Sequence, residues 1–294
     1  MTDVPIAAVV LSLVAALLFA CGAVAQQSAA SAVPDGRSLV SGLVSSRRWW
    51  AGLVGDAGGY LVQVAALAVG SVLIVQPLLV TMLLFALPLS ARFSGLTMRR
   101  STWVFASVLA ASLVVFLAVG NPTEGNSDAP WSQWALPLCV VVGVCAAATA
   151  GAFAIRDPRW RALLLGSAGG VLFGVAVAFT KYVTDLVGDG LLEAATAWQT
   201  WALVASGVIG FYLQQKAFQV GPLAASLPAV TVGEPIGAAV LGIAVLDERL
   251  RTGGVGFVVV GAAVAAMIAS AILLSRVQAV VGTDDLGPVA HDSA

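Results

Sequence analysis

The sequence predicts an all-α, polytopic membrane protein, because its composition and its recurring apolar segments both indicate lipid surroundings. Of its 294 residues, 60% are hydrophobic and only 10% are charged, and the mean hydropathy is +0.98. A soluble domain carries about 25% charged residues, so this chain lacks the polar surface that water requires. Segments of about 20 apolar residues recur, which is the length of a helix that crosses a bilayer core. The alternation typical of barrel strands does not accompany them, so we expect helices.

Nine such segments are present. Their approximate bounds are 4–27, 50–69, 71–91, 101–119, 134–155, 161–186, 196–218, 222–246 and 253–276. All eight tryptophans fall near segment ends, where the interface between lipid and water favours this side chain. Residues 23–25 resemble a signal-peptide cleavage site, but the chain begins Met-Thr-Asp without a basic residue. We therefore expect the first segment to stay as a membrane helix.

The loops between these segments differ in charge. Three alternate loops carry the arginines Arg37, Arg47 and Arg48; Arg92, Arg99 and Arg100; and Arg156, Arg159 and Arg161. The loop after the fourth segment and the loop after the sixth carry acidic residues instead. Since basic loops remain on the cytoplasmic side, we expect the N-terminus outside the plasma membrane and the C-terminus inside. One loop, with Arg249 and Arg251, opposes this orientation.

An internal repeat explains the exception. At a constant offset of 151 residues, the following pairs are identical: Gly59 and Gly210, Gln63 and Gln214, Ala66 and Ala217, Val69 and Val220, Gly70 and Gly221, Pro77 and Pro228, and Arg100 and Arg251. Chance similarity between helices rich in Ala, Val and Gly is the alternative, but shared Gln, Pro and Arg favour a repeat. The single segment between the two copies would invert the second one, which places its arginine loop outside.

The repeat gives the domain organisation. Residues 1–119 form the first repeat, 120–160 the connecting loop and linking helix, 161–276 the second, inverted repeat, and 277–294 a disordered cytoplasmic tail. This is a 4+1+4 arrangement of helices. Inverted repeats with proline-interrupted helices at matching positions are typical of secondary transporters, whose substrate sites lie near the bilayer midplane. We expect helix breaks at Pro77, Pro228 and Pro235.

The motifs of several enzyme classes are missing from the sequence. It has no G-x-x-x-x-G-K-[ST], no H-E-x-x-H and no G-x-S-x-G, and its only histidine is His291 in the polar tail. We therefore expect no enzyme activity and no cofactor. The three cysteines, Cys21, Cys139 and Cys145, lie in predicted helices without C-x-x-C spacing, and we interpret them as small apolar residues.

The strongest candidate site residue is Glu234. It lies about 18 Å from the inner end of its segment at about 1.5 Å per residue, which is near mid-bilayer. A charge there costs at least about 2.5–3.5 kcal/mol, so Glu234 must face the interior or be protonated. Thr231 is on the same helix face, and Pro235 leaves the Thr231 carbonyl without a donor. This oxygen set suits a proton, Na⁺ or Mg²⁺.

Further polar candidates lie on other segments. They are Gln63, Gln76, Gln214 and Lys181. Each has a structural alternative: the glutamines could form interhelical hydrogen bonds, and Lys181 could pair with a structural Glu234. We also expect the G-x-x-x-G stretches at 166–174 and 233–237 to bring their two helices into contact, since small residues allow close approach.

Two stretches resemble a known family. Residues 210–221, followed by SLPAVTVGEPIGAAVLGIAVLDERL at 226–250, are similar to the EamA-like kind of the drug/metabolite transporter superfamily. The family pattern is a proline-bearing helix that ends in G-E-R-L; here Asp247 replaces the glycine. The resemblance covers nearly the whole membrane region and implies secondary transport, commonly export, of small metabolites or drugs.

A branch of that superfamily is also similar. Nine segments, an outer N-terminus, and Gln26 and Gln27 at the end of the first segment resemble the NIPA-type magnesium transporters. That resemblance implies Mg²⁺ as substrate. A typical EamA protein has ten helices, so one is missing from the first half of this chain.

We therefore predict a secondary transporter that moves a small metabolite or drug-like solute across the plasma membrane by alternating access, coupled to protons or a cation. A Mg²⁺ transporter, a lipid flippase and a non-transporting membrane scaffold are the alternatives. The expected partners are a small-molecule or ion substrate and membrane lipids, with no nucleic acid; a homodimer is one option for the assembly.

Overall fold

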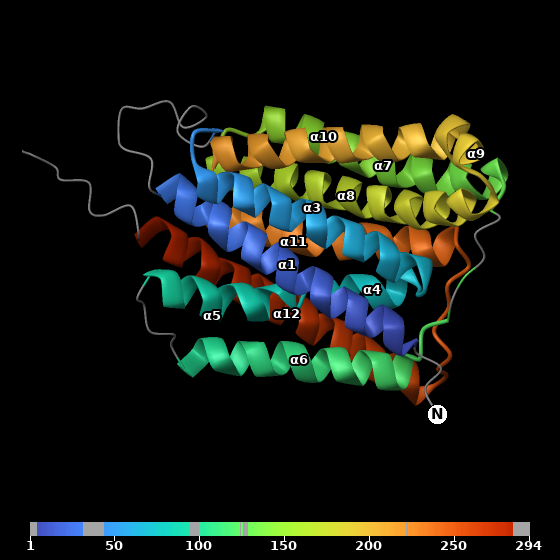
Figure 1. Cartoon of the computed structure of the whole chain (residues 1–294), viewed down its shortest axis with the longest axis horizontal. Coiled ribbons are helices and arrows are strands. Elements are labelled where there is room, and N and C mark those ends of the chain that lie inside the picture. Colours follow the sequence, from blue (N-terminus) through green and yellow to red (C-terminus); the bar gives the residue numbers. More distant parts are fainter. Residues whose placement is uncertain are drawn as a thin grey trace, which may run out of the picture.

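The computed structural model describes residues 5–31, 44–94, 100–123, 125, 129–221 and 223–284. Its helices are α1 (Ile6–Ser31), α3 (Arg47–Ala68), α4 (Val72–Leu79), α5 (Met82–Ser94), α6 (Arg100–Gly120), α7 (Trp131–Ala154), α8 (Pro158–Asp189), α9 (Leu191–Thr196), α10 (Trp198–Val220), α11 (Leu223–Ala244) and α12 (Val255–Asp284). The long helices lie side by side in one bundle (Figure 1). The predicted all-α fold is thus confirmed for the described residues.

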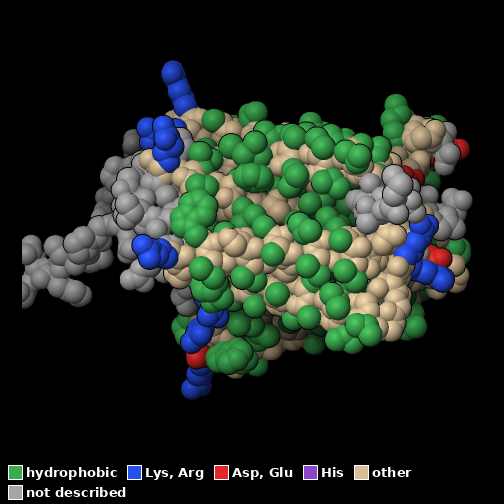
Figure 2. Space-filling model, turned by 90° about the horizontal axis from the view of Figure 1, so that it is seen from below, with side chains coloured by type: hydrophobic (Ala, Val, Ile, Leu, Met, Phe, Trp, Pro, Cys, Tyr) green, Lys and Arg blue, Asp and Glu red, His purple; other side chains and the backbone are tan. Residues whose placement is uncertain are grey.

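Eight helical stretches are long and apolar enough to cross a membrane. They are Ile6–Gln26, Arg47–Ala68, Val72–Leu89, Arg100–Gly120, Trp131–Ala154, Pro158–Gly188, Ala225–Ala244 and Val255–Val277. Figure 2 shows the matching surface: basic side chains gather at the two ends, and the band between them is hydrophobic or uncharged. The chain is therefore a multi-pass membrane protein.

The ninth predicted segment, 196–218, forms α10, which is not among these eight stretches. Its 23 residues would span about 34 Å at 1.5 Å per residue, but Gln199, Gln214, Gln215 and Lys216 lower its hydropathy. Apart from Leu213, its buried positions are small or polar, whereas most of its exposed positions are apolar. The large exposed apolar residues are Trp198, Trp201, Val204, Val208, Ile209, Phe211 and Tyr212.

Several helix boundaries differ from the prediction, and the start of α8 and the end of α12 are two examples. Helix α8 begins at Pro158, because the Asp157 carboxylate accepts a 2.8 Å hydrogen bond from the main-chain N–H of Arg159 and caps the helix. Helix α12 continues to Asp284, so the expected disordered tail is wrong for 277–284. The rest of that predicted tail, with His291, lies outside the described residues.

The predicted segment 71–91 is divided into α4 and α5. Pro77 lies inside α4, which ends at Leu79, so the break follows the proline and is not at it. The turn is tight: the N–H groups of Thr81 and Leu84 donate to the carbonyls three residues earlier, at 3.0 and 2.8 Å. Such i to i−3 bonds are typical of 3₁₀ geometry at helix junctions.

Helix α11 runs without interruption from Leu223 to Ala244, so the expected breaks at Pro228 and Pro235 are wrong. Each proline removes one main-chain donor, but the remaining hydrogen bonds continue the helix. Packing against a neighbouring helix keeps such prolines tolerable within a membrane.

Helix α8 is central to the second half. It packs against α11, α10 and α7, and also contacts α3 of the first half. Its contact with α11 depends on the predicted glycines: a Cβ on Gly170 would lie 2.5 Å from the Val230 carbonyl oxygen, and one on Gly174 would lie 2.3 Å from that of Glu234. The expected close contact between these two glycine-rich helices is confirmed.

Seven of the eight tryptophans are at least partly exposed, and the exception is Trp134. Trp134 is completely buried and stacks on Phe179, with ring centroids 4.6 Å apart. Tyr182 and Trp198 contact it edge to face. Trp134 therefore belongs to a core that joins α7, α8 and α10, because this α7 residue has aromatic partners on both of the other helices.

Candidate functional site

A helix break in the first half has its two ends held by charged side chains from the second half. Helix α3 ends at Ala68 and α4 begins at Val72, with Gly70 and Ser71 buried between them. A Cβ on Gly70 would lie 2.5 Å from the Cβ of Ala8, so α1 approaches the break too closely for a larger residue. The termini of both helices meet here, and termini leave main-chain groups without partners.

The carboxylate of Glu248 satisfies the start of α4. Its Oε1 accepts a 2.7 Å hydrogen bond from the N–H of Val72, and its Oε2 accepts a 2.8 Å bond from the N–H of Leu73. The Glu248 side chain is completely buried. Because the N-terminus of a helix carries partial positive charge, it stabilises this carboxylate away from water.

The loop around Glu248 is itself held in place. The N–H of Glu248 donates to the carbonyl of Gly242 at 3.0 Å, and Asp247 adopts a left-handed φ of 53°. The next residues pair with the loop after α6: the N–H of Thr123 donates to the Arg249 carbonyl at 2.8 Å. Asp247 and Arg249 form an exposed ion pair. The sequence DERL thus directs its first and third side chains outward and its second inward.

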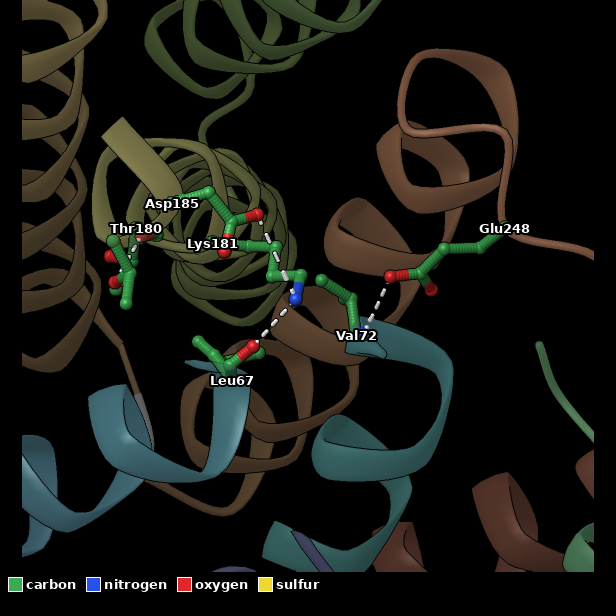
Figure 3. A network of polar contacts seen from close by, with 7 residues as sticks. Leu67, Val72, Thr180, Lys181, Asp185 and Glu248 are labelled. Atoms are coloured by element: carbon green, nitrogen blue, oxygen red, sulfur yellow. Dashed lines mark hydrogen bonds and ion pairs between the residues drawn. The ribbon is translucent and has the colours of Figure 1, made fainter. Parts of the chain in front are cut away.

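Lys181 occupies the other side of the break. Its Nζ donates a 2.7 Å hydrogen bond to the carbonyl of Leu67, in the last turn of α3, and lies 3.8 Å from Asp185. A helix C-terminus carries partial negative charge, so a cation stabilises it. Figure 3 shows Lys181 and Glu248 reaching the two helix ends from different sides. The second half therefore supplies a charge of suitable sign to each end of the break.

Beside this break, a cavity of about 270 Å³ lies between α4, α6, α11 and α12. Its wall is almost entirely apolar and has two polar side chains, Gln76 and Thr231. The apolar part consists of Val72, Leu73, Pro77, Val80, Phe116, Val232, Pro235, Ile236, Ala239, Ile243, Leu250, Val260, Val264, Met267, Ile268 and Ala271. Four predicted residues, Gln76, Pro77, Thr231 and Pro235, thus meet at one cavity.

The two polar groups of the wall differ in how they are satisfied. Thr231 Oγ1 donates a 2.9 Å hydrogen bond to the carbonyl of Leu227 in its own helix. Gln76 is only 2% exposed, and its Nε2 makes no hydrogen bond with any described residue. A buried donor without a partner costs about 1–3 kcal/mol, so Gln76 needs an acceptor from elsewhere.

Glu234 lies on α11 next to this cavity but not in its wall. It lies three positions after Thr231, so the two side chains are about 60° apart around the helix. Its side chain is half-buried and makes no hydrogen bond or ion pair with any described residue. The alternative pairing with Lys181 does not occur, because Lys181 binds the end of α3 instead.

The remaining candidates stand apart. Gln63 is buried on α3 and Gln214 is half-buried on α10, two helices that each pack against α8. Neither belongs to the cavity wall. Among the described residues, no group of three or more His, Cys, Asp or Glu side chains comes together as a metal site would require.

Sequence reasoning missed Glu248. It stands next to Arg249 in a short polar stretch, which is typical of a solvated loop. The break at Gly70 and Ser71 implies that the first main-chain N–H groups of the following helix need a hydrogen-bond acceptor. The sequence does not show which residue supplies it. Asp56 can be interpreted from sequence as a hydrated residue near the inner end of its segment, but its half-buried carboxylate accepts a 2.5 Å hydrogen bond from Gln26 Nε2, which links α3 to α1.

The comparisons with known proteins give one relative. The chain is 35% identical over 277 residues to the uncharacterized protein Cgl0250/cg0304 of Corynebacterium glutamicum. The aligned residues cover 92% of this chain and 94% of the relative. No protein-family model and no solved structure matches the chain. At this identity and coverage, the chain belongs to the same family as the Corynebacterium glutamicum protein.

Proposed function

We propose that this protein is a secondary transporter of the EamA-like drug/metabolite type, which moves a small solute across the plasma membrane by alternating access. The observation that carries the proposal is the cavity between α4, α6, α11 and α12. Its wall contains Pro77 from the first half and Pro235 from the second, so a solute there contacts both halves. Transporters built from repeats hold substrate at such an interface.

The packing scheme supports an inverted 4+1+4 repeat. Helix α1 packs against α3, α4 and α5, and its counterpart α8 packs against α10 and α11. The last helices of the two halves, α6 and α12, pack against each other. A two-fold axis that exchanges the halves would produce these same pairings.

In this proposal α10 is the ninth crossing. Its exposed face is mostly apolar and suits lipid, and its buried face, which is small or polar apart from Leu213, is covered by α8. The start of α1 and the short helix α9 lie at one end of the bundle (Figure 1). We assign that end to the outside, because the arginine-rich loops fall at the other end.

Glu234 is the proposed coupling group. It is the acidic side chain nearest in sequence to Thr231 of the cavity wall, and it has no partner among the described residues. Ionising a carboxyl group at this depth in the membrane costs free energy, and this cost falls only when the group becomes hydrated or gains a counter-charge. Movement of α11 relative to α4 would provide such a change.

The test is solute uptake by purified protein in proteoliposomes, with a panel of small metabolites and Mg²⁺, with and without a pH gradient. We expect gradient-driven uptake of at least one organic solute, and its loss in Glu234→Gln, which keeps shape and hydrogen bonding but cannot titrate. Glu193→Gln, an exposed carboxylate on α9, is the matched control and should transport normally. Unchanged transport by Glu234→Gln would make Glu234 structural. Uptake of Mg²⁺ alone would favour the NIPA-like alternative, and no uptake of any solute would favour a scaffold.

A further inference from the structure

We propose that the cavity between α4, α6, α11 and α12 binds an uncharged, compact, apolar solute that carries one carbonyl or hydroxyl oxygen, and that Gln76 recognises this oxygen. This inference names the substrate class and rests on the transport function proposed above. It depends on the chemistry of the wall, on the size of the cavity and on the unpaired amide of Gln76.

The cavity wall, as far as it is described, supplies no counter-charge for an ion. None of the described residues that line the cavity carries a charge, and all but Gln76 and Thr231 have apolar side chains. An ion that leaves water for such a place loses its hydration without gaining a counter-charge, which is costly. An apolar solute gains from the same transfer, because its surface leaves water.

The size of the cavity narrows the solute further. A cavity of about 150 Å³ holds benzene, and pockets for drug-sized ligands have about 300–1,000 Å³. At about 270 Å³, this cavity lies just below the drug-sized range. It therefore fits a compact ring or cage compound better than an extended drug molecule.

Gln76 supplies the polar recognition. Its side chain is part of the wall, and its buried Nε2 has no hydrogen-bond partner among the described residues. An oxygen acceptor on a bound solute would satisfy this donor. Hydrogen-bonded recognition also gives selectivity, because a solute without the oxygen leaves the amide unpaired.

The prolines add acceptors to the same wall. Pro77 and Pro235 have no N–H, so the carbonyls of Leu73 and Thr231 lack their usual α-helical donor. Leu73 and Thr231 both line the cavity. A hydroxyl group could therefore accept from Gln76 and donate to one of these carbonyls, and a ketone would use Gln76 alone.

The test uses four compounds with one rigid apolar cage: 2-adamantanone, adamantane, 1-adamantanecarboxylate and 1-adamantylammonium. Binding to the full-length protein in nanodiscs is measured by equilibrium dialysis, with empty nanodiscs subtracted. We expect saturable binding of 2-adamantanone, about five- to tenfold weaker binding of adamantane, and no saturable binding of either ion. Equal binding of ketone and hydrocarbon, or saturable binding of an ion, would overturn the inference.

Two variants locate the site. Gln76→Leu should bind ketone and hydrocarbon equally, whereas Gln215→Leu, the same change at an exposed position on α10, should keep the preference. Ala239→Phe fills the cavity and should abolish binding of both compounds. A ketone preference that survives Gln76→Leu would contradict the role of Gln76, and the wild-type comparison stands even if this variant does not fold.

Native mass spectrometry on the same nanodiscs tests whether the cavity binds a lipid and not a solute. We expect 2-adamantanone to displace any phospholipid bound there, and a phospholipid that stays bound would overturn the inference.

Failure of this inference can be distinguished from failure of the transport proposal. Saturable ketone binding without uptake in proteoliposomes would overturn transport alone, and uptake of a charged metabolite without ketone binding would overturn this inference alone.

Discussion

The main-chain N–H of Val72 donates a 2.7 Å hydrogen bond to the completely buried carboxylate of Glu248. The two residues are 176 positions apart, in opposite halves of the chain. The contact joins the start of α4, which supplies Val72, Leu73, Gln76 and Pro77 to the cavity wall, to the loop before α12. Any relative movement of the halves must therefore stretch or release it, together with the bond from Lys181 to the end of α3.

Removing the Glu248 carboxylate should destabilise the protein. Glu248→Ala leaves the N–H groups of Val72 and Leu73 without an acceptor, and each unsatisfied donor costs about 1–3 kcal/mol. We expect a clear fall in the midpoint of thermal unfolding in detergent, followed by tryptophan fluorescence. Glu248→Gln, which keeps one acceptor, should lie between Ala and wild type. Glu193→Ala is the exposed control, and an equal effect at both positions would contradict the capping role.

Lys181 and Glu248 should be energetically coupled through the break. Lys181→Met removes the donor to the Leu67 carbonyl, and Lys181→Arg should restore part of the lost stability. Residues that share one structural element show coupling energies of about 0.5–3 kcal/mol in double-mutant cycles. The cycle of Lys181→Met and Glu248→Gln, measured by unfolding, should give a value in that range. Strict additivity would mean that the two helix ends are held independently.

The packing of α8 against α11 leaves no room for a methyl group at Gly174. A Cβ on Gly174 would lie 2.3 Å from the Glu234 carbonyl oxygen and 2.4 Å from the Ala238 nitrogen, both rigid main-chain atoms. Gly174→Ala should therefore cost about 1–3 kcal/mol, the usual effect of overpacking. Gly143→Ala on α7, where nothing lies within 4 Å, should be neutral or slightly stabilising. Tolerance of both substitutions would show that the two helices separate easily.

The orientation can be read from cysteine accessibility. In a background without Cys21, Cys139 and Cys145, we expect Glu193→Cys on α9 to react with an impermeant maleimide on intact cells. Arg156→Cys, in the exposed loop before α8, should react only after permeabilisation. Both positions are exposed, so a reversed pattern would place the N-terminus inside.

The sequence alone predicted all eight of the stretches that are long and apolar enough to cross a membrane. That outcome depends on the free energy of transferring each segment into lipid, which is nearly a sum over its own residues. The same local logic identified the close contact of α8 and α11, because glycines spaced by four residues leave a flat helix face wherever they occur. It also identified Gln76, Thr231 and their neighbouring prolines, which are conspicuous in an apolar stretch.

Tertiary structure decided what these residues do. Near the predicted end of its segment, Trp134 looks interfacial, but α7 directs it into an aromatic core with Phe179. Glu234 and Glu248 are both carboxylates of the second half, yet only Glu248 receives hydrogen bonds from a helix start. The reason is physical: a buried charge depends on the donors around it, and those donors come from a helix terminus far away in the sequence. Local composition determines burial in lipid, whereas the partner of a buried charge is decided only when the two halves pack.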